Sequence, residues 1–243
     1  MTPMPRAGVL ASAVPEAASG TAPSRPTLLF EHGWAFDGSL WDALRPHLAD
    51  WPQVVADAGY FGAPGPARPG GPIVAIGHSH GFLRLVQEGA PDWAGWVAIN
   101  GFSRFTGADD FPAGVAPRVL QRMLARFDVD PATVVDDFRL RCGSPPAGRP
   151  LDTDRLGAGL RVLAGGAGRA ALARGRVPGL ALAGEADPIV PPALTRASFG
   201  GLQGTRIEWR AGGKHVLPVT APDWCAGHIR RYLEGLAGPG RAA

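Results

Sequence analysis

Three residues that together can make a hydroxyl group nucleophilic follow one another along the chain, namely Ser79, Asp187 and His215. A serine hydroxyl is a weak nucleophile, so it needs a histidine as base, and the histidine needs a carboxylate to orient its ring. Ser79 is the centre of residues 77–81 (GHSHG). This Gly-x-Ser-x-Gly pattern is typical of a nucleophile on a sharp turn between a strand and a helix. The residues therefore predict a catalytic triad that acts through an acyl-enzyme.

The predicted acid and base lie in loops that follow apolar runs. Asp187 comes after residues 179–183 (GLALA), and His215 comes after residues 205–209 (TRIEW). Asp187 would hold the imidazole in one tautomer, and His215 would take the proton from the serine and return it to the leaving group. Glu185 is an alternative acid, because it precedes Asp187 in the same loop.

Two backbone N–H groups are predicted to form an oxyanion hole, which stabilises the negative charge of a tetrahedral intermediate. One belongs to His80, directly after the nucleophile, and the other to Trp34, in the turn after the first strand. The side chains of Trp34 and His80 are expected to line the substrate pocket as well. His78 and His80 flank the serine, but no thiol or carboxylate cluster joins them. A packed neutral His78 is therefore favoured over a metal site.

Alternating strands and helices must position these residues. The predicted strands cover residues 27–30, 53–56, 73–76, 96–99, 179–183 and 205–209. Their apolar character is typical of a parallel sheet that is covered on both faces. The predicted helices cover residues 37–48, 80–88, 116–127, 131–142, 154–173 and 221–236. This alternation indicates an α/β fold with a mostly parallel central sheet and helices on both of its faces.

The chain is expected to have three parts. Residues 1–25 are rich in Ala, Pro, Ser and Gly and are predicted to be a flexible tail rather than a well-formed signal peptide. Residues 26–103 and 177–243 are predicted to form the core. Residues 104–176 hold three helical patterns in succession and are predicted to be a helical lid over the carboxyl ends of the strands, where open sheets bind ligands.

Composition excludes several classes of function. The 243 residues hold 24 Lys and Arg against 21 Asp and Glu, an excess too small to indicate nucleic-acid binding. No run reaches the roughly 18 apolar residues that a membrane span needs. Cys142 and Cys225 lie in no metal-type or redox spacing, so a reduced cytoplasmic setting without metal or cofactor is expected. Lys214 is the single lysine, so nearly all positive charge is arginine.

Arg118, Arg122 and Arg126 recur every four residues in the predicted helix 116–127. Residues at this spacing share one helix face. The row is consistent with a solvated face, and equally with a site that pairs with an acidic helix or a phosphate.

At these motifs the sequence resembles the α/β-hydrolase superfamily over residues 26–237, and within it the pimeloyl-[acyl-carrier protein] methyl ester esterases of biotin synthesis. The segments that carry this resemblance are residues 32–34 (HGW) with Trp41, residues 99–103 (INGFS), residues 110–112 (DFP) and residues 116–120 (APRVL). Phe138 matches a phenylalanine that lines the acyl channel of that family. His78 and His80 depart from its usual tryptophan and leucine, and Phe82 replaces a frequent glycine.

The resemblance implies an α/β-hydrolase fold with an inserted lid, and hydrolysis of a methyl ester on a medium-length acyl chain. It also implies that the chain is carried by acyl-carrier protein, that Phe138 contacts the substrate, and that arginines of the lid dock the carrier. A general carboxylesterase, a thioesterase of another pathway and a haloperoxidase side activity use the same triad. A non-catalytic binding protein is the alternative of another class, because fold does not fix function.

Overall fold

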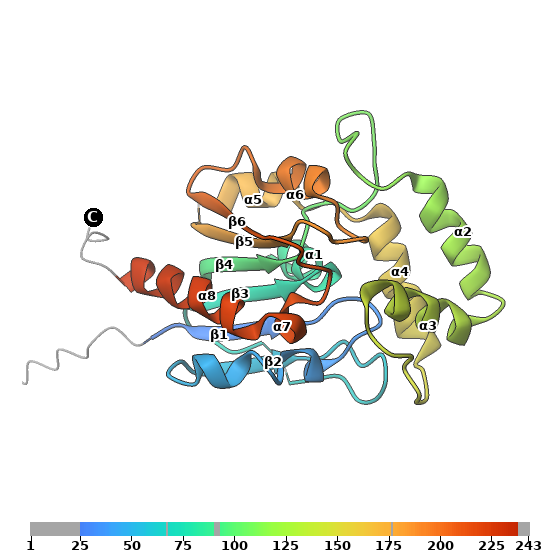
Figure 1. The fold of residues 1–243 in the computed structure, drawn as a ribbon, viewed down its shortest axis with the longest axis horizontal. Coiled ribbons are helices and arrows are strands. Elements are labelled where there is room, and N and C mark those ends of the chain that lie inside the picture. The colour runs from blue at the N-terminus through green and yellow to red at the C-terminus, as the bar shows by residue number, and fades with distance from the viewer. Residues whose placement is uncertain (1–24, 67, 90–92, 176, 238–243) are drawn as a thin grey trace, which may run out of the picture.

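The computed structural model describes residues 25–66, 68–89, 93–175 and 177–237, which fold around one central sheet (Figure 1). Its strands lie in the order β2-β1-β3-β4-β5-β6, and all neighbours pair in parallel. They are β1 (Thr27–Glu31), β2 (Gln53–Ala56), β3 (Ile73–His78), β4 (Trp93–Ile99), β5 (Gly179–Gly184) and β6 (Thr205–Arg210). All six predicted strands are confirmed, with boundaries that differ by at most three residues.

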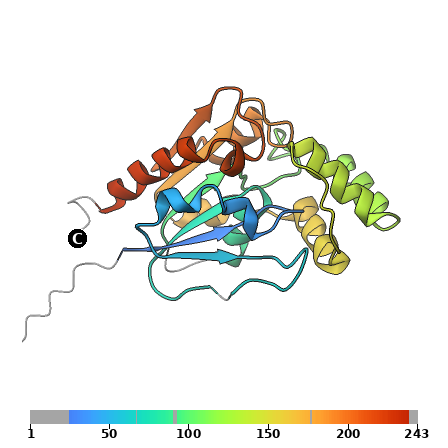
Figure 2. The same cartoon turned by 60° about the horizontal axis from the view of Figure 1, so that its bottom comes forward.

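Helices cover both faces of the sheet, so that alternate residues of each strand point into two separate apolar layers. One layer packs the sheet against α1 (His80–Glu88), α5 (Arg169–Gly175) and α6 (Pro192–Phe199). The other packs it against the short 3-10 helices η1 (Gly38–Trp41) and η2 (Arg45–Leu48), the short helix α7 (Leu217–Thr220) and the last helix α8 (Pro222–Ala237). Figure 2 shows α8 lying along one face of the sheet.

Two predicted helices are wrong in form. The helix expected at 37–48 is split into η1 and η2, because Pro46 has no N–H to continue the hydrogen-bond ladder and fits only the first turn of a new helix. The helix expected at 154–173 is also split, into α4 (Thr153–Gly165) and α5. Gly166 separates them with an extended backbone, φ −70° and ψ 139°. Helices α6 and α7 were not predicted.

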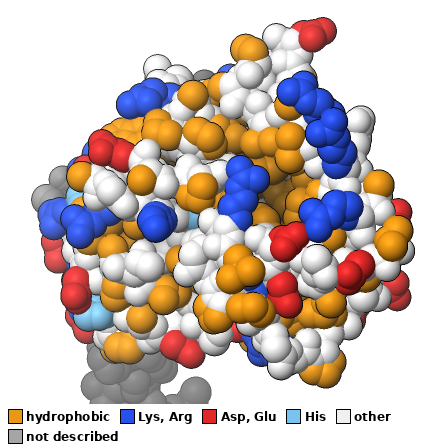
Figure 3. Space-filling model, turned by 45° about the vertical axis from the view of Figure 1, so that its right-hand side comes forward, with side chains coloured by type: hydrophobic (Ala, Val, Ile, Leu, Met, Phe, Trp, Pro, Cys, Tyr) orange, Lys and Arg blue, Asp and Glu red, His pale blue; other side chains and the backbone are white. Residues whose placement is uncertain are grey.

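Three helices between β4 and β5 project from one end of the sheet (Figure 1). They are α2 (Pro117–Phe127), α3 (Pro131–Cys142) and α4, and α2 packs against both others. Their buried side chains, such as Leu120, Val135 and Leu160, join the same apolar cluster as the strands. Figure 3 turns this side forward and shows an apolar hollow with basic side chains along its edge. That residues 104–176 act as a lid remains a prediction.

Residues 1–24 of the predicted tail lie outside the described residues. Among the residues that are described, no helix is both long enough and apolar enough to cross a membrane.

Candidate active site

Ser79 lies on the turn between β3 and α1, in the conformation that the Gly-x-Ser-x-Gly pattern predicts. Its φ is 53° and its ψ is −124°, a strained backbone for a residue with a side chain. The glycines on either side allow the turn to close. A Cβ atom on Gly77 would lie 2.3 Å from Cα of Phe82, and one on Gly81 would lie 2.4 Å from the carbonyl oxygens of Glu31 and His32. Strand, turn and helix can therefore pass one another only with glycine at both positions.

The structure brings Ser79, His215 and Asp187 together in one chain of hydrogen bonds. His215 Nε2 lies 3.1 Å from Ser79 Oγ, and His215 Nδ1 lies 2.8 Å from Asp187 Oδ2. A carboxylate can only accept, so Nδ1–H donates to Asp187 and Nε2 is left to accept the proton of the hydroxyl. All three side chains are buried, with 4% of Ser79 and none of His215 exposed.

Asp187 is held as an anion by four donors. The N–H groups of Ile189 and Val190 donate to Oδ1 at 2.7 and 2.9 Å, and Asn100 Nδ2 donates to Oδ2 at 2.6 Å, beside His215. Burial alone would raise the pKa of Asp187, but the charge of His215 and the hydrogen bonds from His215, Val190 and Ile189 outweigh burial and hold the pKa below its usual value.

Glu185, the alternative acid, is exposed and bonds through its backbone to Arg210. Its carboxylate therefore does not compete with Asp187 for the imidazole. Asn100 is a site residue that sequence reasoning missed. It follows β4 directly and has φ 47°. The signal that the sequence offered was its position at the carboxyl end of a central strand.

His78 is buried and neutral. Burial, and then the positive charge of His215, lower its pKa from 6.5 to about 3. Its Nε2 lies 3.0 Å from the carbonyl oxygen of His215, and its ring lies edge-on to Phe36 at 5.8 Å between centroids. His78 therefore supports the backbone of His215, the predicted base. In the described part of the chain, no group of three or more His, Cys, Asp and Glu side chains is placed to hold a metal ion.

The turn after β1, residues 33–37, is called the oxyanion loop below because it contains Trp34, the predicted second oxyanion donor. Its start is fixed by His32, which donates through Nδ1 to the carbonyl oxygen of Gly33 at 2.9 Å and accepts at Nε2 from the N–H of Ala58 at 2.9 Å. A Cβ atom on Gly33 would lie 2.8 Å from His78 Nδ1 and 3.1 Å from Ser79 Cβ. The oxyanion loop therefore passes directly beside the nucleophile.

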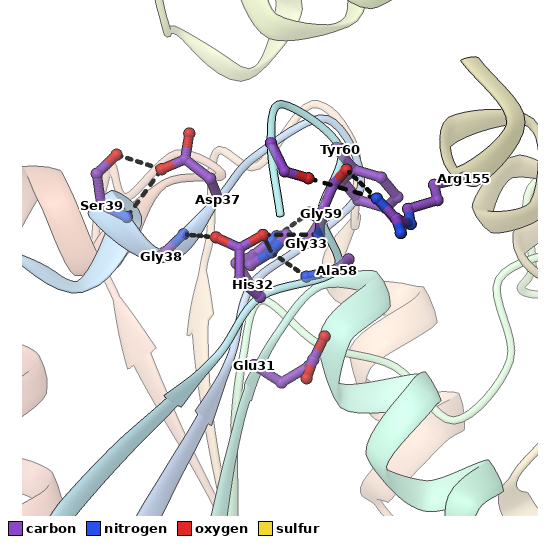
Figure 4. Close-up of polar contacts among 12 residues, drawn as sticks. Glu31, His32, Gly33, Asp37, Gly38, Ser39, Ala58, Gly59, Tyr60 and Arg155 are labelled. Carbon is purple, nitrogen blue, oxygen red and sulfur yellow. Dashed lines mark hydrogen bonds and ion pairs between the residues drawn. The ribbon is translucent and has the colours of Figure 1, made fainter. Parts of the chain in front are cut away.

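Asp57 ties the loop after β2 to the residues that follow the oxyanion loop. Its carboxylate accepts from the N–H groups of Gly38 and Gly59, both at 2.8 Å, and lies 3.3 Å from His32 Nε2. Figure 4 labels His32, Gly38 and Gly59 at this site, with Arg155 of α4 reaching toward Gly59. Burial would raise the pKa of Asp57, but its interaction with His32 and the hydrogen bonds from the N–H groups of Gly59 and Gly38 lower it to about 2.

Trp34 connects the core to the projecting helices. Its indole Nε1 donates to the carbonyl oxygen of Leu156 on α4 at 2.8 Å. Its ring lies edge-on to Phe138 of α3, 5.0 Å between centroids, and to Phe127 of α2 at 6.3 Å. The two predicted substrate-binding residues Trp34 and Phe138 are thus in contact, although their roles remain predictions.

The side chain of His80 contacts Tyr60. Its Nδ1 lies 3.4 Å from the hydroxyl of Tyr60. It lines a hollow of about 240 Å³ between α1 and α4, together with Tyr60, Arg84 and Arg155. Burial, and then the charge of Arg84, lower the pKa of His80 from 6.5 to about 3. A larger cavity of about 590 Å³ lies at the opposite edge of the sheet, near Pro178 and Gly204, and none of the described residues that line it is ionisable.

No known family model matches the sequence. It is similar to the biotin biosynthesis bifunctional protein BioHC of Cellvibrio japonicus, at 25% identity over 88% of this chain, which spans about half (49%) of that protein. Pimeloyl-[acyl-carrier protein] methyl ester esterases are similar over most of both chains. The one from Neisseria meningitidis serogroup C is 26% identical over 84% of this chain and 92% of its own, and the one from Stenotrophomonas maltophilia strain R551-3 is 28% identical over 87% and 94%.

Solved structures share the fold at lower identity. The esterase from Exiguobacterium antarcticum has a TM-score of 0.73 and 13% identity, covering 87% of this chain and 92% of its own. The thermophilic esterase from Thermogutta terrifontis has a TM-score of 0.71 and 17% identity over 88% and 92%. MenH from S. aureus has a TM-score of 0.71 and 14% identity over 89% and 96%. The predicted fold is therefore confirmed.

Proposed function

We propose that this carboxylic ester hydrolase with the α/β-hydrolase fold cleaves the methyl ester of a pimeloyl-type acyl chain carried by acyl-carrier protein. The observation that carries the proposal is the hydrogen-bonded chain from Ser79 through His215 to Asp187. The names of the relatives supply the substrate class. The proposed roles are Ser79 as nucleophile, His215 as general base and acid, and Asp187 as orienting acid.

Acylation begins when Ser79 Oγ attacks the carbonyl carbon of the ester while His215 Nε2 accepts the hydroxyl proton. The carbonyl oxygen becomes an oxyanion, and the N–H groups of Trp34 and His80 are proposed to donate to it. Asp187 stabilises the imidazolium that forms. When the intermediate collapses, the bond to the methoxy group breaks, and His215 returns its proton so that methanol leaves.

Deacylation repeats these roles with water. His215 accepts one proton from the water as its oxygen attacks the acyl carbon, and the same two N–H groups face the new oxyanion. The bond to Ser79 Oγ then breaks, and His215 returns the proton to the serine. The free carboxylate of the acyl chain leaves. The buried position of all three side chains strengthens each electrostatic step, because little water competes with the donors.

The aromatic group of Trp34, Phe127 and Phe138 is proposed to contact the acyl chain. Trp34 belongs to the oxyanion loop, and its ring contacts Phe127 of α2 and Phe138 of α3. Apolar side chains suit methylene groups, each worth about 0.8 kcal/mol when buried. Phe138 is the member of the group that the family resemblance also identifies.

Arg118, Arg122 and Arg126 on α2 are proposed to dock the acidic carrier. All three are exposed. Arg126 Nη2 pairs with Asp137 of α3 at 2.8 Å. Among the residues that the structure describes, neither Arg118 nor Arg122 has an ion-pair partner. Val119, which is 42% exposed, lies beside them. A row of cations next to apolar surface suits an amphipathic acidic helix.

The proposed substrate is tested by comparing the methyl ester of pimeloyl-acyl-carrier protein with p-nitrophenyl esters of increasing chain length. The carrier ester should be cleaved with a kcat/KM at least tenfold above that of the small esters, and Ser79→Ala should lose several powers of ten in kcat. Release of the acyl group from the carrier, instead of methanol, would identify a thioesterase. Efficient cleavage of small esters alone would identify a general carboxylesterase.

The docking surface is tested by Arg118→Glu with Arg122→Glu. This charge reversal should raise KM for the carrier ester about tenfold or more, leave kcat unchanged, and leave p-nitrophenyl ester hydrolysis unchanged. The effect should shrink at high salt, because exposed charges are screened within about 10 Å at 0.1 M ionic strength. Arg174→Glu on α5 is the matched control. An unchanged KM would remove this surface from the proposal and leave the hydrolytic function intact.

A further inference from the structure

The oxyanion loop contains a residue in a strained backbone conformation, Ala35, within a turn that the N–H of Phe36 closes by donating to the carbonyl oxygen of Gly33 at 3.3 Å. Ala35 has φ 60°, a left-handed value that residues with a side chain rarely adopt. It is fully buried and follows Trp34, the proposed second donor to the oxyanion. Strained residues of this kind persist only where surrounding contacts hold them. The contacts that hold Ala35 therefore decide where the Trp34 N–H points.

Arg139 of α3 contacts the main chain at Ala35 itself. Its Nη1 donates to the carbonyl oxygen of Ala35 at 2.7 Å, and its Nε donates to the carbonyl oxygen of Pro145 at 2.8 Å. Its guanidinium also lies over the ring of Phe36, 4.9 Å from the ring centroid. No carboxylate pairs with Arg139 in the part of the chain that the structure describes. Its donors are directed at main-chain oxygens, so its contacts fix the backbone rather than balance a charge.

Two other contacts from the same helical segment hold the oxyanion loop on either side of Ala35. The Trp34 indole donates to Leu156 on α4. The Arg149 guanidinium pairs with the carboxylate of Asp37. Arg149 also lies 4.4 Å from the ring centroid of Phe61, a ring that Arg139 approaches from 5.9 Å. Among these contacts, only that of Arg139 reaches the main chain of the oxyanion loop.

We propose that Arg139 is a positioning residue of the oxyanion hole, which holds Ala35 so that the Trp34 N–H faces the tetrahedral intermediate. This inference rests on the proposed function, because it requires Ser79 to form such an intermediate. Arginine suits the role because its rigid fork donates in two directions while its flat face stacks on an aromatic ring. The ammonium group of a lysine cannot reproduce that geometry.

A residue of this kind acts on the transition state more than on the bound substrate, so its loss should lower kcat and leave KM nearly unchanged. Removing an oxyanion donor outright lowers kcat about 10²- to 10³-fold. Arg139→Met misplaces the donor without deleting it, so a loss of about 10- to 100-fold is expected. Methionine keeps an apolar chain over Phe36. Arg161→Met, at an exposed arginine of α4, is the matched control and should retain wild-type kcat.

The readout that separates positioning from general damage is inhibition by a trifluoromethyl ketone. Ser79 Oγ adds to its carbonyl carbon, the hydroxyl proton passes to His215, and the carbonyl oxygen becomes an oxyanion in the hole. Arg139→Met should lose affinity for the ketone by the same factor as kcat/KM. It should still label completely with a fluorophosphonate at long times, and its KM for p-nitrophenyl esters should stay within about twofold of wild type.

An unchanged kcat, or a raised KM with unchanged ketone affinity, would overturn the role of Arg139 while Ser79 still labels. If Arg139→Met does not fold, Arg139→Lys keeps the charge and the aliphatic stem, and it should show a loss of the same kind; wild-type kcat in that variant would equally overturn the inference. A wild-type protein that neither labels nor hydrolyses any ester would instead refute the proposed function, and the role of Arg139 with it.

Discussion

Asp187 shows how much of the candidate site depends on one side chain. It accepts hydrogen bonds from His215, Asn100 and two backbone N–H groups. These contacts orient the imidazole and keep the carboxylate ionised despite its burial. Because its pKa is lowered on folding, Asp187 contributes stability above its unfolded pKa of about 3.9, and this contribution is lost as the pH falls through the folded value.

Asp187→Asn should lower kcat by about 10⁴-fold, as the loss of the orienting carboxylate does in a serine protease triad. The amide cannot stabilise the imidazolium, and its NH₂ group favours the wrong tautomer of His215. Steady-state hydrolysis of a p-nitrophenyl ester measures the loss. Glu185→Gln is the matched control, since that carboxylate is exposed two residues away, and it should retain full activity. Equal losses in the two variants would contradict the assignment of the acid.

Single residues differ in how far the sequence reveals them. Ser79, Asp187 and His215 could be selected because a motif and a chain order constrain them. Asn100 and Arg139 belong to no such motif: the signal for Asn100 was its position after a central strand, and Arg139 meets Ala35 across 104 residues. Only the folded chain brings such pairs together. The side chain of His80 was expected to line the substrate pocket. It lines a hollow with Tyr60, and its role stays a prediction.

The turn between β3 and α1 is the element on which the nucleophile depends. β3 and β1 pair in parallel, and Gly81 passes so close to the end of β1 that a Cβ atom would meet two carbonyl oxygens. Backbone atoms cannot yield as a flexible side chain can. The close crossing of strand and helix therefore requires both glycines of the motif. The serine between them lies beside the oxyanion loop.

Gly81→Ala should lower the free energy of unfolding by about 2 kcal/mol or more, because overpacking against fixed backbone costs about 1–3 kcal/mol even where side chains can adjust. Urea unfolding followed by circular dichroism measures the change. Gly62→Ala is the control: a Cβ atom there meets nothing within 4 Å, so a change within about 0.5 kcal/mol is expected. Wild-type stability of Gly81→Ala would refute this account of the turn.

Helices were predicted well where neighbouring residues mark their start and end. They were predicted poorly where a residue inside the helical pattern interrupts the helix. The helix Pro131–Cys142 matches its prediction, because Asp130 caps it, Pro131 starts it, and Gly143 ends it in a left-handed conformation. The segment 37–48 has helical spacing of apolar residues, but Pro46 divides it. Helix α6 was not predicted. It begins at Pro192, directly after Pro191, and proline is found both in loops and in the first turn of helices.

The molecule as a whole holds two neutral histidines in its centre. His78 and His80 are fully buried, and the pKa of each is lowered from 6.5 to about 3, chiefly by burial. Between pH 6.5, the pKa of a histidine in the unfolded chain, and about pH 3, the unfolded chain binds protons at both rings while the folded chain does not. Stability is therefore lost as the pH falls from 6.5 toward 3, and each histidine contributes a slope of up to about 1.4 kcal/mol per pH unit.

His80→Leu should reduce the slope of the free energy of unfolding against pH by about 1.4 kcal/mol per pH unit within that window. Urea unfolding at a series of pH values from neutral to moderately acid measures the slope in wild type and variant. Above the unfolded pKa of histidine, the difference between the two proteins should be constant. Parallel curves at acid pH would show that His80 is protonated in the folded protein.

The exposed side chain of Lys214 gives the protein a built-in attachment point. It is the single lysine of the chain, and the residue after it is His215, which is completely buried. An amine-reactive dye therefore has one side-chain target, and that target lies on the loop that carries the proposed base. A fluorophore attached there would report ligand binding and acylation in the native protein, without an engineered cysteine. Immobilisation through the same amine would attach the protein to a surface directly beside His215. Surface-bound assays therefore need a different attachment point.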